Sequence, residues 1–440
     1  MEQKNKTLLP WSVILIISAA IFSGHFGVGD LIFPPILGRD SGICWLIAAL
    51  GYGVINSLGV FIAYLAVSIQ DKSLFGLASS VLGKNFGVVF TTLSMLIIGP
   101  VFILPRVSSA THEMAVAQFF PSIPIWVTLL IFFALNYYFA YNRSKVIDNL
   151  GKYLAPILIV FMVILVIKGI ASPLASPAFP GSPIAFSEGI LNGYNTMNAL
   201  GASLFGLWLI NEFNMRGVKT KESRKNNLII IGSITAVGLF LSSTVLTYLG
   251  ASSGAKFPDA DIGILTVDFA RGLLGYFGII VFAIILTFAN ITTSIGLTST
   301  AGDTFAQMTN GKLKYTTTVA LSSIVGFLIG LIGLSKVVGY TVPWLMLIYP
   351  ALVVILIMNL FSNFKRVRLA TQIGTIVAIL FSIGDFLPGI GFGSNFFTRM
   401  NSSLPLGNQG LAWLVPTVIA LIAGLIFVKF SKSKPMAEGV

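Results

Sequence analysis

The sequence predicts an all-α polytopic membrane protein. We expect twelve transmembrane helices in a five-plus-five inverted repeat, with helices 1 and 6 broken and two extra helices at the end. Three observations lead to this fold class: the composition, the alternation of apolar runs with basic loops, and two polar interruptions inside apolar runs. The 440 residues are 55% hydrophobic and only 10% charged, whereas soluble domains carry about 25% charged residues. Such a chain cannot cover itself with a polar surface.

Apolar runs of about 18 to 28 residues define the twelve spans. Lys4 and Lys6 precede the first run, as in a signal peptide, but no small-residue cleavage site follows, so we expect an uncleaved first helix. The approximate limits of the spans are 11–36, 43–69, 86–111, 123–141, 150–171, 185–211, 227–250, 271–305, 316–334, 339–361, 370–388 and 411–430.

The basic residues support this count and give an orientation. Twenty of the 27 Lys and Arg residues fall in the termini and the even-numbered loops, six fall on the opposite side, and Arg106 lies inside the third span. Loops rich in Lys and Arg stay in the cytoplasm. We therefore expect a multi-pass protein of a bacterial inner (plasma) membrane, with residues 1–10 and 431–440 both cytoplasmic.

The formal charge of +12 does not indicate a nucleic-acid partner. The basic residues are divided among short loops, so no continuous basic face could follow a phosphate backbone. We expect membrane lipid as the surrounding partner instead.

Two apolar spans contain polar and glycine-rich interruptions. The first is interrupted at Ser23–Asp30, and the sixth at Gly193–Gly201. Their separation by five spans predicts a first five-helix repeat over 11–171, a second over 185–361, and helices 11 and 12 over 370–430. Because five is odd, the second repeat enters the membrane from the opposite side, which is a transporter pattern with substrate bound at the midplane.

An interrupted helix offers binding groups inside a membrane. Unwound backbone carries N–H and C=O groups that are costly in hydrocarbon unless something satisfies them. The freed carbonyls can coordinate a cation, and the N-terminus of the second half-helix can receive a carboxylate. The alternative is that the glycines only let helices pack closely.

Several motifs together resemble one transporter family. They are FGVGDLIFPPILG (26–38), GPVFILPR (99–106) followed by Glu113, NGYNTMNALGASLFG (192–206), ITTSIGLT (291–298), VPWLMLIYP (342–350) and LPLGNQGLAWLVPT (404–417). The chain is similar over nearly its whole length to the branched-chain amino acid:cation symporters, the BrnQ-like carriers. The resemblance implies a leucine-transporter-like fold and uptake of leucine, isoleucine and valine driven by sodium or protons.

The chain departs from the family at three positions near the interruptions. The family usually has Asn where Asp30 stands and Asp where Asn198 stands, and His25 replaces an apolar residue. A carboxylate in the middle of a span is costly and usually functional. Asp30 is expected to ligate sodium, to pair with the substrate ammonium, or to carry a coupled proton.

The expected substrate site lies between the two interruptions. Backbone N–H groups near Gly27 and Gly29 would receive the substrate carboxylate, and Thr196 and Asn198 would complete the polar cradle. An apolar wall, for which Met197 is a further candidate, would hold the side chain, although each wall residue could be ordinary packing. The candidate substrate-binding residues are Gly24, Phe26, Gly27, Gly29, Asp30, Thr196, Asn198, Phe205 and Leu297.

A sodium site is expected beside the first interruption. Related transporter folds place a threonine/serine pair of the eighth span against carbonyls of the broken first span. By that analogy Ser23, Phe26 and Ala289 supply carbonyl oxygens, and Thr292 and Thr293 supply hydroxyls. Oxygen atoms are the ligands that hard cations prefer. The alternative is that the threonine hydroxyls bond back to their own helix.

Arg106 and Glu113 are seven residues apart and share a helix face. We expect structural or gating ion pairs with other spans, with direct substrate contact by Arg106 as the alternative.

No catalytic residues and no cofactor are expected apart from the coupling ion, Na⁺, with H⁺ possible. HEMAV (112–116) is not HExxH, and no GxxxxGK[ST] motif occurs, so neither an enzyme nor an ATPase subunit is implied. The predicted function is symport of branched-chain amino acids with sodium. The alternatives are a proton-coupled symporter that uses Asp30 and a non-transporting membrane sensor of amino acids.

Overall fold

The computed structural model describes residues 8–141 and 160–431, and in these ranges the regular secondary structure is entirely helical. The first part of the chain forms α1 (Trp11–His25), α2 (Val28–Ser41), η1 (Gly42–Cys44), α3 (Trp45–Gly53), η2 (Val54–Leu58), α4 (Gly59–Gln70), α5 (Leu74–Leu82), α6 (Lys84–Leu96), η3 (Ile97–Val101), α7 (Ile103–Thr111), η4 (His112–Val116), α8 (Ala117–Phe119) and α9 (Ile125–Tyr141). An apolar helix over Val160–Ala171 follows.

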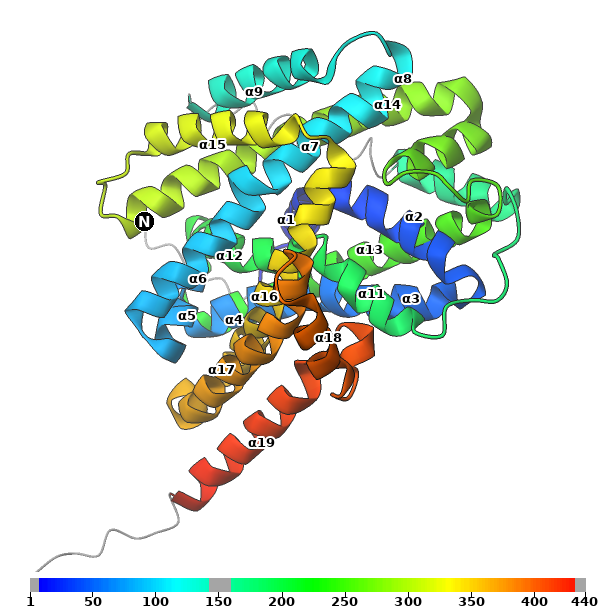
Figure 1. The fold of residues 1–440 in the computed structure, drawn as a ribbon. Helices are drawn as coiled ribbons and strands as arrows, with labels where there is room; N and C mark the ends of the chain where they lie inside the picture. Colours follow the sequence, from blue (N-terminus) through cyan, green and yellow to red (C-terminus); the bar gives the residue numbers. More distant parts are fainter. Residues whose placement is uncertain (1–7, 142–159, 432–440) are drawn as a thin grey trace, which may run out of the picture.

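The second part forms α11 (Ala185–Tyr194), α12 (Asn198–Met215), α13 (Lys221–Gly254), α14 (Ile264–Met308), α15 (Tyr315–Gly330), α16 (Leu334–Met358), α17 (Phe364–Gly389), α18 (Ser394–Ser402), η5 (Gly407–Gln409) and α19 (Leu414–Ser431). Figure 1 shows α7, α9, α14 and α15 together across one side, with α2, α3, α11 and α13 beside them and α17 and α19 extending away.

Six helical stretches of the described chain are long and apolar enough to cross a membrane, and five further apolar helices are shorter. Each predicted span contains helix in its described part, although the fifth, 150–171, is described only from residue 160. The all-α prediction is confirmed, whereas the count of twelve and the limits of the two repeats stay predictions. Large apolar side chains such as Leu130, Leu241 and Ile422 point outward, as lipid-facing residues do.

Both predicted interruptions are present. Helix α1 ends at His25 and α2 begins at Val28, with Gly27 in an extended conformation. Helix α11 ends at Tyr194 and α12 begins at Asn198, after Met197 in the left-handed conformation with φ +59°. The two breaks divide predicted spans one and six into half-helices.

Two other kinks were not predicted. Gly99 has φ −107° and ψ −121° next to Pro100, which interrupts the helix between α6 and α7. Helix α14 begins at Ile264, seven residues before the expected start at 271, and it kinks at Gly275, where φ is +64°. The sequence shows no hydropathy change at Gly275, because apolar residues flank it on both sides.

Other glycines do serve close packing. A Cβ atom at Gly38 of α2 would lie 1.8 Å from the backbone oxygen of Thr247 in α13, and one at Gly250 would lie 2.0 Å from that of Pro35. Small residues allow transmembrane backbones to approach in this way. Glycines outside the breaks therefore let α2 and α13 pack closely, whereas the alternative stated above concerned the glycines within the breaks.

A buried polar network joins α9, α14 and α15. The amide nitrogen of Asn136 donates to Thr298 Oγ1 and to Ser323 Oγ, both at 3.1 Å, and Ser294 Oγ donates to the amide oxygen at 2.9 Å. In a membrane the hydrophobic effect does not drive helices to associate, because lipid tails are as apolar as the side chains. Hydrogen bonds between helices are one of the interactions that hold them together instead. Hydrogen bonds between side chains thus hold α9, α14 and α15 together.

Candidate functional site

The two helix breaks meet at a buried carboxylate. The amide nitrogen of Asn198 donates to both carboxylate oxygens of Asp30, at 3.0 Å and 3.3 Å. The amide nitrogen of Asn56 donates to Asp30 Oδ1 at 2.9 Å, and Asn198 donates to Asn56 Oδ1 at 2.7 Å. Asp30, Asn56 and Asn198 therefore form one closed network, which we call the carboxylate network.

Local backbone structure places each member of the carboxylate network. Asp30 lies in the first turn of α2, where a negative charge is favourable, and its N–H donates to the Gly27 oxygen at 3.1 Å. Asn198 begins α12, and its N–H donates to Thr196 Oγ1 at 3.2 Å. Asn56 lies in the π-helical segment η2, between α3 and α4. A π-helical turn contains about one residue more than an α-helical turn, and such segments often occur at functional sites.

The carboxylate network leaves the charge of Asp30 without a direct counter-charge. Asp30 is 3% exposed, and its side-chain partners are neutral amides. Arg106 is near enough to act on it electrostatically, but among the described residues no cationic side chain forms an ion pair with Asp30 within 4 Å. A buried carboxylate in this setting has to meet a cation or take up a proton.

Thr293 faces the break between α1 and α2. A Cβ atom at Gly27 would lie 3.9 Å from Thr293 Oγ1. Thr292 Oγ1 instead donates to its own helix, at 2.9 Å from the Ala289 oxygen and 3.1 Å from that of Phe288. This bonding is the alternative that we stated for Thr292. The expected ligand set of Ser23, Phe26, Ala289, Thr292 and Thr293 stays a prediction.

His25 ends α1 next to the carboxylate network. Its Nε2 lies 2.8 Å from the hydroxyl of Tyr64 in α4, and Asn198 lies within interaction range of the same imidazole. Asn198 thus connects His25 with Asp30. A Cβ atom at Gly201 would lie 3.7 Å from the Phe205 ring and 3.9 Å from the His25 ring, so Phe205 flanks the histidine.

The backbone N–H groups of Gly27 and Gly29 were both expected to receive the substrate carboxylate, but they differ in whether they already have an acceptor. The Gly27 N–H donates to the His25 oxygen at 3.0 Å and is already engaged. Gly29 lies in the first turn of α2, where N–H groups have no acceptor within the helix. A Cβ atom at Gly29 would also lie 3.4 Å from the Thr196 Cα, so the two breaks approach each other here.

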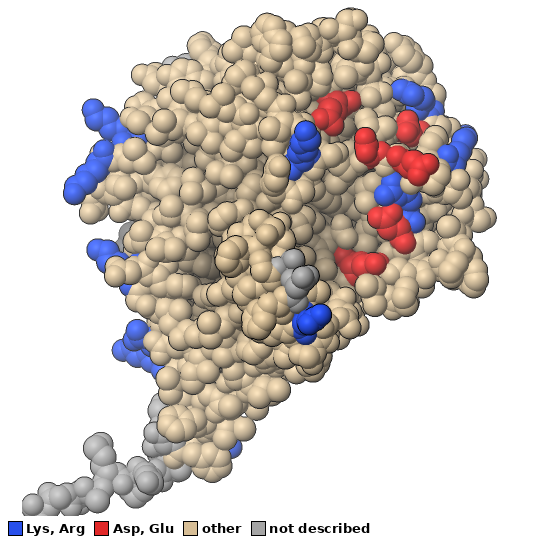
Figure 2. Space-filling view, in the orientation of Figure 1, with Lys and Arg blue, Asp and Glu red and all other residues tan. Residues whose placement is uncertain are grey.

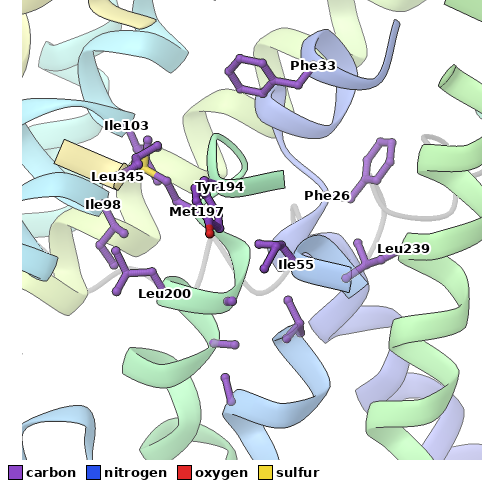
Figure 3. Packing of buried hydrophobic residues seen from close by; sticks show 14 of the residues in the cluster. Phe26, Phe33, Ile55, Ile98, Ile103, Tyr194, Met197, Leu200, Leu239 and Leu345 are labelled. Atoms are coloured by element: carbon purple, nitrogen blue, oxygen red, sulfur yellow. The ribbon is translucent and has the colours of Figure 1, made fainter. Parts of the chain in front are cut away.

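Only some of the residues expected to form the apolar wall of the substrate site lie near the carboxylate network. Figure 3 shows Phe26 near Leu239 on one side of Ile55, with Tyr194 and Met197 on the other side. Leu297 is buried on α14, about one turn beyond Thr293, and Gly24 is exposed with open space where a Cβ atom would be. The structure thus joins Gly27, Gly29, Asp30, Thr196 and Asn198 more closely than Gly24, Phe26 or Leu297.

The expected ion pairs of Arg106 and Glu113 are not present among the described residues. Arg106 Nη1 donates to the backbone oxygen of Asn195 at 2.6 Å, and its guanidinium lies 5.4 Å from the centre of the Phe33 ring. Glu113 Oε1 accepts from the N–H of Leu334 at 2.8 Å, at the start of α16. Each of the two side chains meets backbone rather than an opposite charge.

Sequence reasoning missed Asn56 and Tyr64 as members of the site. A signal for Asn56 existed, because an amide in the middle of an apolar span is costly and often functional. Tyr64 gave no such signal, since aromatic residues are common throughout the apolar spans.

Comparisons with known proteins agree with this architecture. The family described as "Branched-chain amino acid transport protein" matches residues 11–431. Branched-chain amino acid permease BraB of Bacillus subtilis is 32% identical over 451 residues, covering 98% of this chain and 99% of its own. Branched-chain amino acid permease BrnQ of the same organism is 32% identical over 437 residues, covering 95% and 97%.

Solved transporter structures share the fold. The inward-facing conformation of Mhp1 superposes with a TM-score of 0.62 at 13% identity, covering 97% of this chain and 95% of its own. MhsT in complex with L-phenylalanine gives 0.53 at 14% identity, covering 94% and 98%. These similarities confirm the expected leucine-transporter-like arrangement of helices.

Proposed function

The chain belongs to the family of branched-chain amino acid transport proteins, and on that premise we propose that it imports leucine, isoleucine and valine by symport with sodium. The family match and the two permease relatives support branched-chain amino acid transport, and a transporter rather than an enzyme. The comparisons name no coupling ion, so the choice of sodium is argued from the site itself.

The observation that carries the proposal is the meeting of the two broken helices at the carboxylate network. Half-helix ends near the membrane midplane are where such transporters bind substrate and ions, because the unwound backbone is available to ligands. Here a carboxylate of α2 and an amide of α12 are in direct hydrogen-bond contact. A ligand bound at this junction would contact both repeats and could couple their movement.

Sodium is proposed because the first break offers oxygen ligands next to an uncompensated carboxylate. Thr293 Oγ1 faces Gly27 in the first break, where the backbone of the span is unwound between α1 and α2. A sodium ion at this place would offset the charge of Asp30. A proton carried by Asp30 is the competing account of the same buried charge.

We also propose that both termini lie in the cytoplasm of a bacterial cell. In Figure 2 the left edge of the molecule shows Lys and Arg without Asp or Glu, whereas the visible Asp and Glu gather at the right together with further Lys and Arg. The loops that lie at the left in Figure 1, between α14 and α15 and between α16 and α17, carry Lys312, Lys314, Lys365, Arg366 and Arg368. This polarity supports the orientation that the positive-inside rule predicts.

The experiment that tests the proposal is uptake into proteoliposomes. The purified protein should accumulate labelled leucine when an inward sodium gradient is imposed, and excess unlabelled isoleucine or valine should compete. Uptake that ignores sodium but follows an imposed pH gradient would replace sodium with a proton. Binding of leucine without accumulation under either gradient would identify a sensor, and no response to these amino acids would remove the substrate assignment.

A further inference from the structure

We infer that Arg106 binds the carboxylate of the amino-acid substrate, at the junction of the two broken helices. This assignment rests on the proposed function, because it requires a substrate that carries a carboxylate. It differs from the expectation that backbone N–H groups alone hold that group.

The burial of Arg106 calls for an acceptor that the described protein does not supply. Its side chain lies on α7 and is 2% exposed. A buried guanidinium is strongly destabilising unless its charge and its N–H groups are matched. Among the described residues, no carboxylate lies within 4 Å of it.

The contacts that Arg106 makes use only some of the hydrogen-bond donors of its guanidinium group. Nη1 donates to the backbone oxygen of Asn195, one residue beyond the last residue of α11. A cation is favourable at that end of a half-helix, so this contact caps α11. The guanidinium has five N–H groups, however. Nε is fully buried and has no hydrogen-bond partner in the part of the chain that the structure describes.

The remaining donors point between the two breaks. A Cβ atom at Gly29 would lie 3.0 Å from Nη2 of Arg106, so the absence of a side chain at Gly29 admits the guanidinium to the first turn of α2. The N–H groups in that turn also lack helical acceptors. A carboxylate placed there could accept two parallel hydrogen bonds from Arg106 and others from the start of α2.

Other unsatisfied polar atoms surround the same junction. The hydroxyl of Tyr52 and the amide oxygen of Asn195 are buried and find no hydrogen-bond partner within residues 8–141 and 160–431. Tyr52 is near enough to both Asp30 and Arg106 to interact with them electrostatically. Buried polar atoms without partners are uncommon, and a group of them at one place indicates a polar ligand.

The charges at the junction fit a zwitterion. When Asp30 is ionised, Asp30 and Arg106 bring one charge of each sign to the junction, and they interact without forming a direct ion pair. Figure 3 shows Ile103, one turn before Arg106 on α7, close to Leu345 and beside Met197, so apolar side chains border the charged groups. Electrostatic interactions are stronger in such surroundings than in water. A free amino acid carries one charge of each sign, an ammonium group that could pair with Asp30 and a carboxylate that could pair with Arg106.

The test compares leucine with leucinamide, which has the same side chain and ammonium group but no carboxylate. Binding to the purified full-length protein in detergent is measured by calorimetry. We expect the wild type to prefer leucine by roughly 30-fold or more, the range for an unpaired buried charge. Arg106→Gln should lose most of that preference by weakening leucine binding alone, and Arg106→Lys should retain part of it.

The matched control is Arg271→Gln, which removes an exposed arginine of α14 that interacts with Gln118. This control should keep the wild-type preference. Equal binding of leucine and leucinamide by the wild type, which needs no variant, would overturn the assignment. Equal weakening of both ligands in a folded Arg106→Gln protein would reduce Arg106 to a structural cap and overturn it as well.

The failure of this inference is distinguishable from failure of the proposed function. If the wild type binds another α-amino acid but not leucine, the proposed substrate class is wrong, and Arg106 is tested with that amino acid and its amide. If the folded wild type binds no amino acid at all, both proposals are overturned.

Discussion

The side-chain amide of Asn198 donates to the carboxylate of Asp30 at 3.0 Å, which joins the second half of one broken helix to the second half of the other. The resemblance stated above implies the opposite arrangement in the family, with Asn in the first span and Asp in the sixth. The contact explains how the two arrangements could be equivalent, because either residue can bring the single carboxylate to the same place.

The exchange of these two residues is the first prediction. Asp30→Asn should abolish leucine uptake, because it removes the only carboxylate of the network, and Asn198→Asp should impair uptake, because two adjacent carboxylates repel. The double variant should recover a substantial part of the activity. The coupling free energy should be about 1–3 kcal/mol, as for residues in one network. Uptake rates per folded transporter measure it.

The control for the exchange is Asp40→Asn, which affects an exposed residue paired with Arg39. It should transport like the wild type. Losses in the two single variants that simply add in a normally folded double variant would contradict a shared site.

The second prediction separates the two neighbouring threonines. Thr293→Ala should raise the sodium concentration needed for half-maximal uptake by roughly five- to 150-fold, since losing one buried oxygen partner costs about 1–3 kcal/mol. Thr292→Ala should change it much less, because the Thr292 hydroxyl donates to its own helix. Sodium titrations of initial uptake rates measure both values. A larger shift in Thr292→Ala than in Thr293→Ala would reverse the assignment.

The third prediction concerns the partner of His25. Tyr64→Phe removes the hydroxyl that lies 2.8 Å from Nε2 and leaves a buried ring nitrogen unsatisfied. The expected cost is about 1–3 kcal/mol, seen as a lower melting temperature of the protein in detergent. Tyr137→Phe is the matched control, because Tyr137 is 39% exposed on α9. Equal melting temperatures for the two variants would show that the His25–Tyr64 contact contributes little to stability.

The fourth prediction tests the close approach of α2 and α13. Gly38→Ala places a methyl group against the backbone of Thr247, which cannot move aside as a flexible side chain could. The cost should be about 1–3 kcal/mol or more, as for overpacking, and should reduce the yield of monodisperse protein. Gly339→Ala is the control, since nothing lies within 4 Å of a Cβ atom there. A folded Gly38→Ala protein with unchanged melting temperature would mean that the two helices can separate at little cost.

The sequence by itself determined that the chain is helical, that it is built for a membrane, and where two helices break. Hydropathy and charge are local properties, and a cluster such as Ser23–Asp30 inside an apolar run is visible without any knowledge of packing. Asp30 and Asn198 were also both predicted as residues of one site between the two breaks, and their side chains are in contact in the structure. The kink at Gly275 escaped detection, because a single glycine between apolar residues is ordinary in a membrane helix.

Only the tertiary structure decided which side chains share the site. The spacing in the sequence predicted Arg106 and Glu113 on one helix face. It could not show that Arg106 of α7 would meet the end of α11 and that Glu113 of η4 would meet the start of α16. Asn56 joined the carboxylate network for the same reason, through the rotation of the α3–η2–α4 segment against α2. Helix rotation and partner choice depend on packing between segments far apart in the chain, and the pattern within one segment does not contain that information.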